Sequence, residues 1–172
     1  LILVAFLLLG CSFAALSYQY IAQDKQETME RNASYIANFT SSYLSSGIGS
    51  GIQDGAYQLY VASVANISGS TVILAENDGE IVYTASGTGQ SSGDLLSGRV
   101  PADWLETVSR EGGRMERSSL GGLLPDKSYV AAVPILQSSF ITGKTYQRGV
   151  VLMVSESSSL TAMWQDLAAI FM

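Results

Sequence analysis

The sequence predicts an α+β fold, in which a long N-terminal helix packs on a central, mostly antiparallel five-stranded sheet flanked by membrane segments. Three observations lead to this prediction. The chain opens with an uncharged apolar run, and more than thirty residues without Gly or Pro follow Gly10. Five short segments rich in β-branched and apolar residues, separated by turn signals, then follow between residues 71 and 155.

The apolar run predicts a transmembrane helix over residues 1–21. Its first sixteen residues carry no charge, and a helix needs about 20 mostly apolar residues to cross a bilayer. Two alternatives are a cleaved signal peptide and a lipoprotein signal, in which Cys11 of Leu8-Leu9-Gly10-Cys11 would be lipidated. Residues 13–16 continue the apolar run where a lipoprotein has a polar tether, so we favour a span.

Charge is confined to the stretch between Asp24 and Asp166. Nine basic and fifteen acidic residues give it a net charge of −6, which disfavours nucleic acid and anionic lipid as partners. The chain has one Cys and no His, so neither a disulfide framework nor imidazole chemistry is available within it. We therefore expect a non-catalytic region with no metal and no cofactor.

The anchor runs into a polar helical stretch at residues 22–44. Ala22, Met29, Ile36 and Tyr43 recur every seven residues and form one apolar stripe. The stripe has two interpretations. It packs on the sheet of its own domain, or it pairs with the same helix of a second copy and makes a homodimer.

Turn signals divide the next part of the chain. A Gly-rich break at residues 45–51 ends the long helix, and helical spacing of apolar residues predicts a second helix over residues 54–67. Two strands, at residues 71–75 and 80–85, flank the tight-turn signal Asn77-Asp78-Gly79. These two strands are expected to form a hairpin.

The segment 86–98 is rich in Gly and Ser and predicts a loop. A short helix follows at residues 101–110, with Pro101 at its first position and Gly112-Gly113 ending it. Three further strands are predicted at residues 114–120, 128–136 and 148–155.

This order of parts carries a family resemblance. The turn and strand Asp78–Thr84, the strand 129–135 with its Pro134, and Gly149-Val150-Val151-Leu152 resemble motifs of the PAS-like extracytoplasmic sensor (Cache) domain of bacterial receptors. The resemblance spans about residues 20–160. It implies an extracytoplasmic PAS-like sensor domain at residues 22–160.

The end of the chain bears on the kind of receptor. Residues 161–172 are increasingly apolar and predict the start of a second transmembrane helix, although an amphipathic helix folded back on the domain has the same pattern. Two spans around a sensor domain imply the sensing region of a two-component sensor histidine kinase in the cell membrane. The alternatives are a chemotaxis receptor, a diguanylate cyclase, an anchored ligand-binding lipoprotein and a structural interaction domain.

The resemblance also implies a ligand between the sheet and its covering helix, the stimulus being a small molecule or a protein. Tyr83 and Tyr129 lie on predicted strands, Trp104 on the covering helix and Arg114 at the start of the third strand. Together they would form a pocket for a carboxylate, because Arg binds planar anions with paired hydrogen bonds. The other interpretation makes the three aromatic residues plain core and Arg114 a surface charge.

Overall fold

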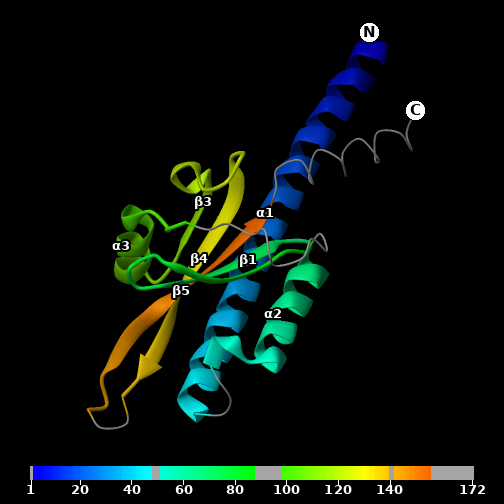
Figure 1. Cartoon of the computed structure of the whole chain (residues 1–172). Coiled ribbons are helices and arrows are strands. Elements are labelled where there is room, and N and C mark those ends of the chain that lie inside the picture. Colours follow the sequence, from blue (N-terminus) through cyan, green and yellow to red (C-terminus); the bar gives the residue numbers. More distant parts are fainter. Residues whose placement is uncertain (1, 48–50, 88–97, 140–141, 156–172) are drawn as a thin grey trace.

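The computed structural model describes residues 2–47, 51–87, 98–139 and 142–155, with the side chains of residues 2–8, 11, 14 and 18 outside the description. Helices pack on both faces of one five-stranded sheet (Figure 1). The predicted α+β class is confirmed, and it is consistent with the PAS-like fold that the resemblance implies. The predicted second membrane segment at residues 161–172 lies outside the described residues.

Helix α1 (Ile2–Ser46) is continuous and reaches well beyond the sheet (Figure 1). Its C-terminal half contacts β4 and β5, and Met29, Ala33, Ile36 and Ala37 are at most 3% exposed. The apolar stripe in this half of the helix therefore packs on the sheet of its own domain. Met29 and Ile36 both lie in this core, and the pairing of two copies through the N-terminal helix stays a prediction.

A short 3-10 turn, η1 (Gly51–Gln53), leads from α1 into α2 (Gly55–Ser68). The Asp54 carboxylate accepts a hydrogen bond from the Ala56 amide, which satisfies one of the unpaired donors at the start of α2. Gly69 ends the helix in the left-handed conformation. Helix α2 lies beside the C-terminal half of α1, on the same side of the sheet (Figure 1).

The sheet has the strand order β2-β1-β5-β4-β3, and every neighbouring pair is antiparallel. All five predicted strands are present, as β1 (Thr71–Glu76), β2 (Ile81–Ala85), β3 (Arg114–Ser118), β4 (Ser128–Ser138) and β5 (Thr145–Ser155). Strands β4 and β5 are longer than predicted and form a hairpin that projects from the sheet (Figure 1). The edge strand β3 carries charged residues, which discourage pairing with another chain.

Both faces of the sheet are buried, and they belong to two separate cores. On the face under α1 and α2, Val72, Leu74, Val151 and Met153 join the first core. Their neighbours Ile73, Ala75, Val150 and Leu152 point the other way and join the second. Side chains alternate along a strand, so each central strand contributes to both cores.

Helix α3 (Ala102–Glu111) and the turn η2 (Leu120–Gly122) cover the second face, with Trp104, Val108 and Leu120 buried. Pro101 is the residue before the first helical turn rather than its first member, a shift of one position from the prediction. Gly112 ends α3 in the left-handed conformation, as its position after the helix indicated.

Two irregularities interrupt the ladders of the sheet, one between β1 and β2 and one between β4 and β5. Between β1 and β2, Leu74 pairs with Tyr83 and Ala75 with Ile81, so Val82 is an extra residue. Between β4 and β5, Ile135 pairs with Gly149 and Leu136 with Gln147, so Arg148 is an extra residue. Both are β-bulges, which bend a strand and redirect its side chains.

Within the part of the chain that the structure describes, no helix has the length and apolar character of a membrane span. The span predicted at residues 1–21 falls largely on side chains outside that description, and it stays a prediction.

The buried stripe of α1 gives a direct stability test. Replacing Ile36 with Ala removes a fully buried side chain, and we expect a loss of roughly 2–5 kcal/mol of unfolding free energy. The adjacent Tyr35 is 58% exposed, so Tyr35→Ala is the matched control and should cost less than about 1 kcal/mol. Urea unfolding measures both, and equal losses would contradict the packing of α1 described here.

Candidate functional site

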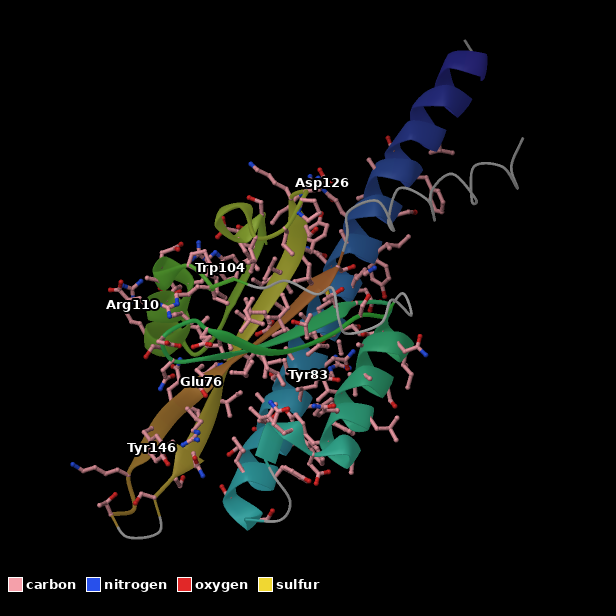
Figure 2. All side chains as sticks on the ribbon, in the orientation of Figure 1. Glu76, Tyr83, Trp104, Arg110, Asp126 and Tyr146 are labelled. Atoms are coloured by element: carbon pink, nitrogen blue, oxygen red, sulfur yellow. The ribbon has the colours of Figure 1, made fainter. Side chains whose placement is uncertain are left out.

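The four residues predicted to line a ligand pocket lie on opposite faces of the sheet. Trp104 belongs to the second core under α3, and Arg114 lies against it. Tyr83 and Tyr129 pack against the first core, on the side of α1 and α2. Figure 2 shows Trp104 at α3 and Tyr83 toward α2. The structure therefore brings Trp104 and Arg114 together, and the four predicted residues do not form one pocket.

Arg114 is held by its own neighbours. Its guanidinium carbon lies 4.2 Å from the centre of the Trp104 ring, a cation–π contact. Its terminal nitrogens donate hydrogen bonds to Asp103, at 3.0 Å, and to Glu116, at 2.7 Å. A further bond from Nε reaches the same Glu116 oxygen at 3.0 Å. Two carboxylates of the chain thus already occupy the guanidinium.

The contacts with Glu116 and Asp103 also affect the pKa of Arg114. Partial burial by itself lowers the pKa of Arg114, but the hydrogen bonds and charges of Glu116 and Asp103 outweigh it and raise the pKa. The Arg114 side chain is 21% exposed, whereas both carboxylates are more than half exposed. A ligand carboxylate would have to displace one of them, so this arrangement serves chiefly to fasten α3 to the edge strand β3.

The face under α1 and α2 contains an aromatic cluster made of Phe39, Tyr43, Tyr57 and Tyr60. The Phe39 ring is the hub, with centroid distances of 4.0 Å to Tyr60, 5.8 Å to Tyr43 and 6.0 Å to Tyr57. Such ring pairs add to the stability that burial alone provides. Tyr83 borders the cluster, and its hydroxyl donates a hydrogen bond to the Gln58 carbonyl at 3.2 Å.

A buried hydrogen bond connects α1 to α2 within this cluster. Thr40 donates to the Ile36 carbonyl at 2.7 Å, so its single hydroxyl proton is used. Tyr57, 2.7 Å from the Thr40 hydroxyl, must therefore be the donor in the bond between them. Burial raises the pKa of Tyr57 to about 12, so the phenol stays protonated well above neutral pH.

A small pocket lies on the same face, where α1 and η1 meet the sheet. We call it the bulge pocket, because both bulge residues, Val82 and Arg148, line it. Its volume is about 40 Å³. The other lining residues are Leu44, Ile52, Leu74, Ala75, Glu76, Ile135 and Gly149.

The bulge pocket combines an apolar lining with two opposite charges. Glu76 and Arg148 are both exposed, and among the described residues neither side chain forms an ion pair. Gly149 permits the close approach of β5 to β1, because a Cβ there would lie 2.3 Å from the Ala75 carbonyl oxygen. This site was not predicted from the sequence. The signal was available in Arg148-Gly149, since a glycine inside a strand often marks a bulge.

Comparisons with known proteins give similarity to solved structures only. No protein-family model matches the chain, and no curated protein sequence matches it. Among solved structures, the chain is similar to the cofactor-binding GAF domain of the nutrient sensor CodY from Clostridium difficile. The match has 14% sequence identity and a TM-score of 0.39, over 76% of this chain and 88% of that one. A match at this level carries no argument about function.

The raised pKa of Tyr57 predicts a loss of stability in alkali. The unfolded chain releases this proton near pH 10, whereas the folded protein holds it to about 12. The stabilisation is therefore complete below pH 10 and falls as the pH rises toward 12, by about 2 kcal/mol. In Tyr57→Phe this alkaline loss should disappear, leaving a cost of about 1 kcal/mol at neutral pH for the lost hydrogen bond.

Urea unfolding at about pH 8 and about pH 11.5 separates the two effects. Tyr35→Phe is the matched control, because the Tyr35 side chain is 58% exposed, and this variant should keep the alkaline loss of the unaltered protein. If Tyr57→Phe lost as much stability in alkali as the unaltered protein, the ionisation of Tyr57 would not be its cause.

Proposed function

We propose that the chain is the extracytoplasmic signal-sensing region of a membrane-bound two-component sensor histidine kinase. The observation that carries the proposal is α1. One uninterrupted helix has its C-terminal half in the core of the domain and its N-terminal half outside it. A stimulus that shifts the domain therefore acts on the same rigid element that would enter the membrane.

The exposed half of α1 supports an anchoring role. Leu9, Phe13, Leu16 and Tyr20 are between 66% and 73% exposed. Large apolar side chains gathered on a helix outside the core are typical of a surface that another apolar phase covers. In the proposed function the apolar phase is the interior of the bilayer, which holds this helix and the same helix of a second copy, and Tyr20 lies in the interfacial region.

The position of the end of β5 also supports a receptor. The strand ends at Ser155, and Met153 lies in the same core cluster as Met29 of α1. The last described residues are therefore close to the part of α1 that leaves the sheet (Figure 1). In the proposed function both flanking segments enter the membrane from this end, and the sensing region itself performs no catalysis.

The anchor and its orientation can be tested together in intact cells. Lys144 is exposed in the β4–β5 loop, so a Lys144→Cys variant in a Cys11→Ser background places one thiol on the domain. We expect a membrane-impermeant maleimide to label it without lysis, and the protein to remain in the membrane pellet after carbonate extraction.

Replacing Leu9, Phe13 and Leu16 together with Lys should abolish both labelling and membrane retention, because each Lys near the middle of a span costs about 2.5–3.5 kcal/mol. Replacing the same three residues with Ala keeps the segment apolar and serves as the matched control. Labelling that required lysis, or a domain released into the medium, would contradict the anchored extracytoplasmic arrangement.

We further propose that two copies pair through the N-terminal half of α1. Met29 and Ile36 are used by the core, so the pairing surface is the stripe Leu9, Phe13, Leu16 and Tyr20. The spacing of four, three and four residues keeps these side chains on one helix face, as in a coiled coil. Paired copies would let a change in the domain act on two spans at once.

Cysteine cross-linking tests this pairing. In a Cys11→Ser background, Phe13→Cys and Leu16→Cys should each form disulfide-linked dimers on oxidation, because disulfides need Cα atoms about 4.4–6.8 Å apart. Ala15 is exposed but faces away from the stripe, so Ala15→Cys should cross-link several-fold less. Equal cross-linking at all three positions would remove the stripe from the proposal.

A further inference from the structure

We propose that the bulge pocket binds a short aliphatic monocarboxylate, with Arg148 as the residue that recognises the carboxylate. The proposal gives a ligand class to the sensing role above and rests on that role for its biological meaning. The site lies on the face under α1 and α2, opposite the face on which Trp104 and Arg114 meet.

The lining selects an aliphatic chain. Leu44, Ile52, Leu74, Val82 and Ile135 supply an apolar surface from α1, η1 and three strands. A cavity of about 40 Å³ is far smaller than the cavity of about 150 Å³ that accommodates benzene. It therefore encloses only the terminal carbons of a short chain, with the rest of the chain and the charged group at the solvent-exposed side where Arg148 lies.

Arg148 is available for an anion in a way that Arg114 is not. Asp103 and Glu116 already occupy the donors of Arg114. Arg148 has no ion pair within the described residues, and its place in a bulge takes it out of the regular ladder. A guanidinium offers a planar fork that matches a carboxylate with two parallel hydrogen bonds.

Glu76 restricts the ligand to one negative charge. Glu76 lines the same small pocket as Arg148, and the two side chains do not form an ion pair. A second carboxylate on the ligand would lie near Glu76 and be repelled, and repulsion of this kind is a common source of specificity. The pocket should therefore prefer a monocarboxylate to a dicarboxylate of the same length.

The experiment is an NMR titration of the full chain in detergent solution, with sodium butyrate as the probe at constant ionic strength. We expect saturable shifts of the Ile52 and Val82 methyl groups, which line the pocket. Arg148→Gln should raise the dissociation constant about tenfold or more, because it removes a charge-assisted hydrogen-bonding partner. Arg117→Gln is the matched control and should stay within about twofold, since Arg117 lies on β3, away from the pocket.

Two further probes test the chemistry of the site. Succinate should bind the unaltered protein at least about fivefold more weakly than butyrate, and Glu76→Gln should reduce that difference to about twofold. Butylamine, which has the same chain with a positive charge, should give no saturable shift. An unchanged preference in Glu76→Gln would overturn the selective role of Glu76.

The proposal is overturned if butyrate gives no saturable shift, if Arg148→Gln binds as tightly as Arg117→Gln, or if butylamine binds as well as butyrate. The titration does not depend on orientation in the membrane. Butyrate binding in a protein that fails the labelling test would retain the site and reject the anchored sensor. Labelling without butyrate binding would reject this site alone.

Discussion

Strand β5 lies in the middle of the sheet with both faces covered, and the arrangement of every other element depends on this. All residues from Gly149 to Ser155 are buried. Val151 and Met153 require the cover of α1 and α2, while Val150 and Leu152 require the cover of α3 and η2. Because both sets are apolar, removing either layer would expose a hydrophobic face to water. The three-layer architecture follows from this one strand.

Most of the elements could be predicted from the sequence, because glycines and apolar periodicity mark them locally. The runs at β1 and β5 are continuously apolar, as in strands buried on both faces, and Gly69 and Gly112 end their helices where left-handed residues are needed. The partner of the α1 stripe could not be predicted, because a core-facing helix and a dimer helix share the same periodicity. The packing of α1 on β4 and β5 shows that the stripe faces the core of its own domain.

The candidate site was harder to predict from the sequence, because the central strands of the sheet are buried on both faces. Alternation of polar and apolar residues normally reveals which face of a strand is buried, but here both faces are apolar. Tyr83 and Trp104 could therefore be assigned to the same face, although they lie on opposite ones. The extra residues Val82 and Arg148 also change the register, and a bulge is a property of two paired strands.

The continuity of α1 makes it a lever with unequal arms. Leu44 at one end lines the bulge pocket, the residues around Ile36 rest on the sheet, and Leu16 lies far beyond it. At 1.5 Å per residue along the helix, Leu16 is about 30 Å from Ile36 and Leu44 is only about 12 Å from it. A tilt of about 5° would move Leu44 by about 1 Å and Leu16 by about 2.6 Å. A displacement comparable to one carbon–carbon bond at the pocket is thereby magnified at the distal end.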